Sequence, residues 1–389
     1  MSLLVDLLVG IVAALGIVAG VLVAMGWFLS TPPWRGPASD HFNGLRFRND
    51  ASMVHAGLRD VGRWMATRKP IPWGRPRDVP PGPRPVERVE GSRLRATLVN
   101  HTTVLLQTQG LNILTDPIWS ARCGPLPGVG PRRVRPPGLR FEDLPPIDVV
   151  LLSHNHYDHC DLRTLKRLAR GHHPRVVVPL GCRAFLEGKG IPVFAELDWW
   201  TEVELGVEVR VIAVPARHFS GRGLFDRDRS LWAGYVIATP AGNTFFAGDT
   251  GFGRHFEAIR ERFGQPRLAL LPIGAFRPEW FMSRVHMSPD EALRAHAIVG
   301  ARISLATHFG TFRLADDGET EAAERIAAFD SARPAGETRL SSHPSARRSR
   351  SRAARHGCRR FHDTSVSPTR LHGSLTASAS TRRVDTTPI

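Results

Sequence analysis

The chain has 389 residues, of which 42% are hydrophobic and 23% are charged. These proportions are close to those of ordinary globular proteins, so they exclude a chain that is disordered throughout and predict one large domain with appendages. The formal net charge of +16 is concentrated at one end, because residues 331–389 carry twelve Arg and three acidic residues, which make up +9 of the total. A basic surface over the whole protein is therefore not expected.

Four cysteines are present, at Cys123, Cys160, Cys182 and Cys358. Their spacing contains no CxxC pair and no disulfide framework, so we expect reduced structural thiols.

The N-terminal segment is uncharged and apolar over 23 residues, from Leu7 to Leu29. A helix of this length spans the core of a bilayer, which makes the segment a candidate transmembrane helix. A cleaved signal peptide is the alternative, but Asp6 stands where a basic region is expected and no small-x-small cleavage site follows. Arg35, Arg46 and Arg48 lie just beyond the apolar run, which favours a catalytic domain on the cytoplasmic face of the membrane.

Two stretches rich in Pro, Gly and Arg interrupt the middle of the chain. Residues 70–85 lack the backbone donors that a helix or a central strand needs, so they predict a linker that wraps around the domain. Residues 124–146 predict an ordered loop between two strands.

Short apolar runs that are rich in β-branched residues and end in turns predict strands. Helical patterns lie between some of them, at residues 161–170 and 289–299, and the second begins with a capping box at Ser288 and Glu291. Many strands with interspersed helices predict an α/β sandwich of two packed sheets. The strand-like runs are RATLVNHTTVLLQT, LNILTDP, IDVVLLSHNH, RVVVPLG, VEVRVIAVPARH, GYVIATP, NTFFAGDTG, LALLPIGAF and RISLATHFG.

The string Ser153–His159 (SHNHYDH) follows directly on the apolar run IDVVLL. Imidazole nitrogens and carboxylate oxygens are the ligands that zinc prefers in catalytic sites. His154 and His156 point to the same side of an extended backbone and can share one ion. Asp158 and His159, at the turn that follows, can reach a neighbouring ion.

Further candidate ligands stand at the ends of three later strands, His218, Asp249 and His308. Loops at strand ends carry functional side chains that the sheet holds in place, so these residues complete a site for two metal ions, with the Asp249 carboxylate as a bridge. Zinc in such a site lowers the pKa of bound water toward about 7 and supplies hydroxide, so no Ser or Cys nucleophile is needed.

The order HxHxDH, His, Asp, His resembles the metallo-β-lactamase superfamily. Segments such as HTTVLLQTQGLNILTDPIWS, SHNHYDHCD, FFAGDTGF, HMSPDEA and HFGTF are similar to N-acyl-phosphatidylethanolamine-hydrolysing phospholipase D and its bacterial relatives, over roughly residues 95–320. The resemblance implies a four-layer αββα sandwich. The resemblance, the apolar N-terminus and the Arg-rich end together predict four segments. These are an anchor (1–30), an extension with the Pro-rich linker (31–94), a catalytic domain (95–330) and a disordered tail (331–389).

The resemblance also implies roles for single residues. His154, His156 and His218 would hold one zinc ion, Asp158, His159 and His308 the other, and Asp249 would bridge the two. The implied reaction cleaves a phosphodiester to phosphatidic acid and an N-acylethanolamine, by attack of a zinc-bound hydroxide on phosphorus.

Three other residues are candidates for roles beside the metal ions. His286 matches a family histidine near the site and would contact the substrate phosphate or the leaving group, which places it with Asp158 and Asp249 among the catalytic candidates. His101 and Asp116 would orient metal-bound imidazoles through hydrogen bonds.

Other functions stay open at this point. Another hydrolase of the superfamily, such as a sugar-phosphate lactonase or a nuclease, fits the metal ligands equally well. A membrane-tethered protein that binds nucleic acid through its Arg-rich tail is a second alternative, but the tail lacks interleaved aromatic residues. The expected partners are the phospholipid substrate and the membrane, with a homodimer left open and no nucleic acid. After the helical pattern ERIAAF the chain departs from the family, through either a divergent tail or a change of translation frame.

Overall fold

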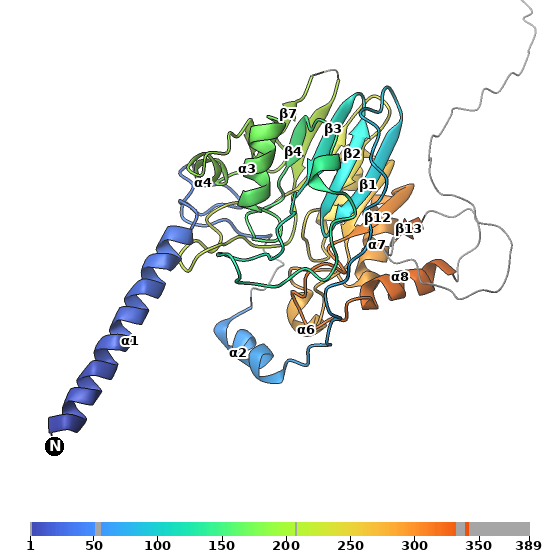
Figure 1. The fold of residues 1–389 in the computed structure, drawn as a ribbon. Helices are drawn as coiled ribbons and strands as arrows, with labels where there is room; N and C mark the ends of the chain where they lie inside the picture. Colours follow the sequence, from blue (N-terminus) through green and yellow to red (C-terminus); the bar gives the residue numbers. More distant parts are fainter. Residues whose placement is uncertain (1, 51–55, 207, 332–338, 342–389) are drawn as a thin grey trace, which may run out of the picture.

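The computed structural model describes residues 2–50, 56–206, 208–331 and 339–341. Two β-sheets pack face to face, and helices cover their outer faces (Figure 1). This arrangement confirms the expected αββα sandwich.

The first sheet has six strands in the order of the chain. The first three are antiparallel and the last three continue in parallel from β3. These strands are β1 (Leu94–Asn100), β2 (Thr103–Thr108), β3 (Leu111–Thr115), β4 (Val149–Leu151), β5 (Arg175–Pro179) and β6 (Ala195–Leu197).

The second sheet has seven strands in the order β13-β12-β11-β10-β9-β8-β7. Strands β7 to β10 pair antiparallel, and β10 to β13 pair in parallel. The strands are β7 (Glu202–Glu204), β8 (Arg210–Val214), β9 (Gly234–Ala238), β10 (Thr244–Phe246), β11 (Leu268–Pro272), β12 (Ile303–Thr307) and β13 (Arg339–Ser341). All the apolar runs that predicted strands contain one, whereas β6, β7 and β13 were not expected.

Side-chain alternation along the strands builds the layers. On β4, Val149 and Leu151 face the second sheet, while Val150 faces the helices on the outside. The layer between the sheets includes Leu106, Tyr235 and Leu270, all of which are fully buried. Because successive side chains of a strand point to opposite faces, a continuous apolar run fits a sheet that is covered on both sides.

Helices close the two outer faces. Asp161 caps α3 by accepting a hydrogen bond from the Arg163 backbone, and α7 begins with the expected capping box of Ser288 and Glu291. One outer face is covered by α3 (Leu162–Gly171) and α4 (Arg183–Glu187). The other is covered by α5 (His255–Phe263), α7 (Pro289–Val299) and α8 (Glu321–Ser331). Two short helices, η1 (Phe141–Asp143) and α6 (Glu279–Met282), lie in the loops.

The N-terminal helix α1 (Ser2–Leu29) protrudes from the domain (Figure 1). Within Val5–Leu29 an 18-residue window has a mean hydropathy of 2.8 and no buried residue, and the span contacts the domain near its end, where Gly26 is buried. The helix is thus long and apolar enough to cross a bilayer, as the sequence predicted.

Two further segments belong to the N-terminal extension. Helix α2 (Leu58–Thr67), which the sequence did not predict, has no buried residue. Residues 70–85 form neither helix nor strand, as expected, and backbone hydrogen bonds from Ile71, Arg77 and Gly82 tie them to the catalytic domain.

The expected disordered tail falls almost entirely outside the described residues, and so does Cys358. Within its range, Arg339–Ser341 forms β13, which pairs in parallel with β12. The other three cysteines are buried free thiols, as expected.

Replacing Leu270 by Ala should lower the free energy of unfolding by about 3 kcal/mol, because a fully buried side chain between the sheets leaves a cavity. Thermal unfolding, followed by tryptophan fluorescence, should shift down by about 2–4 °C per kcal/mol. The control is Ile303→Ala, since Ile303 is exposed at the start of β12, and its shift should be small. Equal shifts for both variants would contradict the assigned core.

Candidate metal centre

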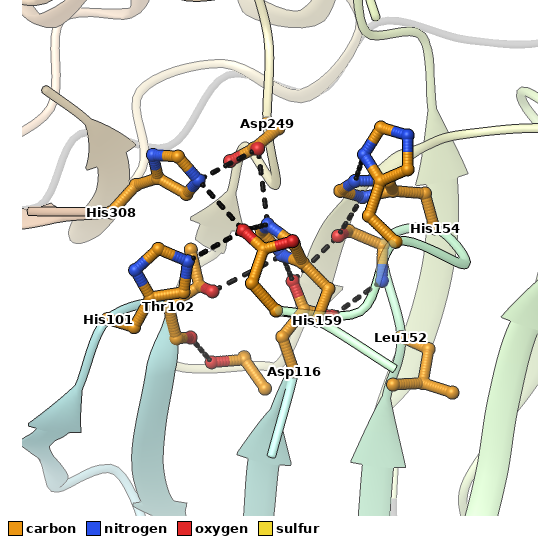
Figure 2. Close-up of polar contacts among 12 residues, drawn as sticks. His101, Thr102, Asp116, Leu152, His154, His159, Asp249 and His308 are labelled. Atoms are coloured by element: carbon orange, nitrogen blue, oxygen red, sulfur yellow. Dashed lines mark hydrogen bonds and ion pairs between the residues drawn. The ribbon is translucent and has the colours of Figure 1, made fainter. Parts of the chain in front are cut away.

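The candidate ligands converge at one end of the sandwich. His154, His156, Asp158 and His159 follow β4, and the loop turns tightly there because the backbone amides of His159 and Cys160 both donate to the carbonyl oxygen of His156. The remaining side chains come from loops that follow β8, β10 and β12 of the other sheet. Figure 2 shows Asp249 reaching across to His159, with His308 paired to the same carboxylate.

The first group consists of His154, His156 and His218. The Nε2 atom of His154 lies 2.8 Å from Nδ1 of His156, and Nε2 of His218 lies 3.3 Å from the same atom. Three imidazole nitrogens thus face one point. Burial lowers the pKa of His156 to about 3 and those of His154 and His218 well below the ordinary value, so all three rings are neutral at pH 7 and offer lone pairs to a cation.

The second group consists of Asp158, His159 and His308, and here the carboxylate of Asp249 joins them. The Nε2 atom of His159 lies 3.1 Å from Oδ2 of Asp158 and 3.1 Å from Oδ2 of Asp249. The Nε2 atom of His308 lies 3.4 Å and 3.0 Å from the same two oxygens. Two carboxylate oxygens and two imidazole nitrogens therefore surround a second point.

Asp249 touches both groups. Its Oδ2 atom, which is near His159 and His308, is also 3.8 Å from Nε2 of His218 and 3.9 Å from Nδ1 of His286. A carboxylate in this position can bridge two ions, which is the role that the sequence predicted.

The two carboxylates are the electrostatic centre of the site. Burial raises the pKa of each, but the surrounding imidazoles, His159 first, outweigh burial and hold the pKa values of Asp158 and Asp249 well below the ordinary value. The reverse holds for His308, because burial lowers its pKa while Asp249 and Asp158 raise it to about 9. Two buried negative charges in one site call for positive charge beside them.

The positions of the donor atoms suit a shared metal ion better than direct hydrogen bonds between the side chains. Nε2 of His159, Nε2 of His308 and Oδ1 of Asp249 are buried without a hydrogen-bond partner, although carboxylate oxygens lie close by. Tetrahedral zinc with bonds of about 2.0–2.1 Å separates its ligand atoms by roughly 3.3 Å. The separations in the second group are of this size, so the residues present fit a shared ion.

A network behind the imidazoles fixes their orientation. The Nδ1 atom of His159 donates to Oδ2 of Asp116 at 2.7 Å. The Ser153 hydroxyl donates to the same oxygen at 2.6 Å and accepts from Nδ1 of His154 at 2.9 Å, while Nδ1 of His218 donates to the Val285 carbonyl oxygen at 2.9 Å. Each of the three rings is thereby held with Nε2 toward the centre, as metal-bound histidines require.

Asp116 therefore lies where the sequence predicted, against a ligand imidazole, whereas His101 does not. The Nε2 atom of His101 lies 2.9 Å from Oδ2 of Asp158, so this residue orients a carboxylate. The spacing of residues along the chain did not reveal which ligand lies opposite His101. His286 stands at the edge of the centre beside Asp249, with a pKa lowered to about 4, chiefly by burial.

Polar side chains that the sequence did not predict hold the ligand loops to distant segments of the chain through hydrogen bonds. Asn49 accepts from the His218 backbone amide at 3.1 Å and donates to the His218 carbonyl oxygen at 2.7 Å. Asn155, inside the His-rich string, donates to Thr31 Oγ1 at 2.9 Å and accepts from the Gly221 amide at 2.8 Å. In the sequence, only the position of Asn155 between two expected ligands could have indicated its role in holding this loop.

The fold and this centre define a metallo-hydrolase of a known superfamily. The family model described as "Beta-lactamase superfamily domain" matches residues 111–309, just over half of the chain. The chain belongs to this superfamily.

Individual relatives show which members of the superfamily this chain resembles. An uncharacterized protein of Mycobacterium tuberculosis is 40% identical over 275 residues, which cover 69% of this chain and 71% of that protein. N-acyl-phosphatidylethanolamine-hydrolyzing phospholipase D 1 of Caenorhabditis elegans is 38% identical over 241 residues, covering 59% of this chain and 67% of that enzyme. The isothiocyanate hydrolase from Delia radicum gut bacteria shares the fold, with a TM-score of 0.50 at 18% identity, over 63% of this chain and 95% of its own.

Replacing His156 by Ala should remove a ligand that faces both His154 and His218, so bound transition metal should fall from about two ions per chain to about one or fewer. Mass spectrometric metal analysis of the purified protein checks this. The control is His173→Ala, since His173 is exposed and outside the cluster. Unchanged metal content in the His156 variant would contradict the assignment.

Asp116→Asn should weaken metal binding about 10- to 100-fold, because a neutral amide holds His159 less firmly than a carboxylate does. Competition with a chromophoric chelator measures the change. Asp148→Asn serves as the control, because Asp148 pairs with Arg88 outside the metal cluster. Loss of the Asp148 charge should leave the metal affinity unchanged.

Proposed function

We propose that this protein is a zinc-dependent phosphodiesterase that hydrolyses N-acyl-phosphatidylethanolamine to phosphatidic acid and an N-acylethanolamine. The observation that carries the proposal is the gathering of five imidazoles and two carboxylates around two points, in a chain that is similar to an enzyme named for this reaction. Neither feature alone is specific, because the metal ligands are compatible with several substrates.

Two zinc ions held by these residues would supply hydroxide at neutral pH and offset negative charge on a phosphoryl oxygen. The chain's own residues contribute the geometry. His154, His156 and His218 would form one ligand set, Asp158, His159 and His308 would form the other, and Asp249 would contact both.

His286 is the residue best placed to meet the substrate. Its ring lies beside Asp249, is slightly exposed, and leaves Nδ1 without a hydrogen-bond partner. With its pKa lowered to about 4 by burial, the ring is neutral at pH 7 and can donate one hydrogen bond to a phosphate oxygen or to the leaving group.

The N-terminal helix supports a lipid substrate. The backbone amide of Thr31, just after α1, donates to Asp226 at 2.7 Å, and its hydroxyl accepts from Asn155 in the metal-binding string at 2.9 Å. If α1 crosses the membrane, this contact keeps the metal centre next to the bilayer surface. Orientation on the cytoplasmic face remains part of the proposal and rests on the Arg residues after the helix.

The reaction can be followed with detergent-solubilised protein and N-acyl-phosphatidylethanolamine in water enriched in ¹⁸O. We expect chelator-sensitive release of phosphatidic acid that carries the label, and of unlabelled N-acylethanolamine, because attack on phosphorus leaves the solvent oxygen on the phosphate. Hydrolysis of bis(p-nitrophenyl) phosphate without hydrolysis of the lipid would reject the lipid substrate.

His286→Ala should lower kcat at least about tenfold on the lipid, because a hydrogen-bond donor is lost from the reacting phosphate. Its metal content should stay that of the wild type, which separates this residue from the metal ligands. A variant with wild-type kcat would remove His286 from the proposed mechanism.

A further inference from the structure

Helix α2 presents an apolar face that nothing in the described part of the chain covers. Leu58 is 91% exposed, Val61 38% and Met65 59%. Positions i, i+3 and i+7 lie on one face of a helix, so these side chains form a single row. Arg59 on the helix and Lys69 just beyond its end are exposed as well, whereas the guanidinium of Arg63 lies over the Trp280 ring of the domain.

The side of α2 that carries Asp60 and Trp64 is attached to the domain, so the exposed row is not the result of a loose helix. The Trp64 ring stacks on Phe281 with centroids 5.0 Å apart, and its Nε1 atom donates to Asp316. Asp60 pairs with Arg284 at 2.8 Å.

Helix α2 lies on the side from which α1 protrudes (Figure 1). At the domain end of α1, Trp27 and Phe28 are exposed, and so are Leu224 and Phe225 of the neighbouring loop. Leu224 packs so closely on Gly26 that a Cβ atom there would lie 2.6 Å from its Cδ1. Exposed aromatic and aliphatic side chains at the end of an apolar helix are typical of the boundary between bilayer core and headgroups.

Both segments connect directly to the metal centre. Thr31 after α1 contacts Asn155 in the metal-binding string. On the other side α2 packs on Phe281 of α6, and the backbone amide of His286 donates to the carbonyl oxygen of Met282 at the end of that helix. Short chains of contacts therefore link the centre to both α1 and α2.

We propose that α2 is a second membrane contact, which lies in the headgroup region with Leu58, Val61 and Met65 toward the lipid chains and with Arg59 and Lys69 available to anionic headgroups. An apolar row flanked by Arg and Lys is the pattern of helices that lie in a membrane interface. With α1 as the anchor, the two contacts hold the metal centre over the bilayer, where a phospholipid headgroup can reach it. This inference rests on the proposed membrane-anchored function.

Photo-crosslinking of the full chain in nanodiscs with anionic lipid tests the contact without any need for hydrolysis. p-Benzoylphenylalanine replaces Val61 in one variant and Ile303 in the control. Ile303 is 44% exposed, at the end of β12 opposite to the metal centre. We expect lipid adducts at position 61 and none at position 303. Equal labelling of both positions, no adduct at position 61, or crosslinks there to a second copy of the chain would overturn the proposal.

Activity provides the second measurement. The variant Leu58→Ser/Val61→Ser/Met65→Ser should lose about tenfold of its rate on N-acyl-phosphatidylethanolamine in nanodiscs, since most of the apolar contact of α2 is removed. Its rate on soluble bis(p-nitrophenyl) phosphate should equal that of the wild type. The matched control is Phe194→Ser/Ile303→Ser, which removes exposed apolar side chains at the starts of β6 and β12 and should leave both rates unchanged.

The two proposals fail in different ways. A wild-type protein that crosslinks to lipid at position 61 and does not hydrolyse the lipid would reject the substrate and keep the membrane contact. Equal rates of the wild type and the triple variant on nanodisc lipid would reject the contact and keep the substrate.

Discussion

The structure depends on placing two carboxylates, Asp158 and Asp249, inside a protein and stabilising their charge. Both are buried, both have a pKa held well below the ordinary value, and their oxygens lie within 3.4 Å of Nε2 of His159 and His308. A buried carboxylate is strongly unfavourable unless positive charge lies beside it. Protonated His308 can supply part of that charge, and metal ions supply it more completely, because the unpartnered nitrogen and oxygen atoms face shared points and not one another. The site is therefore best understood as a cation site that the fold assembles.

The sandwich makes this assembly possible because it brings loops from both sheets to one end. One sheet contributes the string after β4, and the other contributes His218, Asp249 and His308 at the ends of β8, β10 and β12. Rigid packing between the sheets, at residues such as Leu270, sets the distance between the two halves of the site. Asp116, just after β3, then fixes the imidazole of His159 directly and that of His154 through the Ser153 hydroxyl. The ligand geometry is thus a consequence of strand pairing and core packing, completed by the hydrogen bonds behind the imidazoles.

The sequence predicted the fold class and selected side chains that the structure places together, because both follow from local patterns. Buried strands show as apolar runs, and ligands that stand at strand ends can be recognised without knowledge of the pairing. Strands β6 and β7 were missed since each has only three residues, and β7 is largely exposed. Helix α2 was missed although Leu58, Val61 and Met65 have helical spacing, because the helix is only ten residues long and buries none of its residues. The contacts of Thr31 with Asn155 and of His101 with Asp158 join residues 124 and 57 positions apart, and no local pattern indicates such pairs.

The central claim is that these seven side chains bind two metal ions, and anomalous diffraction from crystals of the metal-loaded protein, recorded on both sides of the zinc absorption edge, tests it most directly. The account predicts two anomalous peaks, one within bonding distance of His154, His156 and His218 and the other within bonding distance of Asp158, His159 and His308, both in contact with Asp249. A well-ordered domain with no anomalous peak among these residues, or with its metal bound elsewhere, would contradict it.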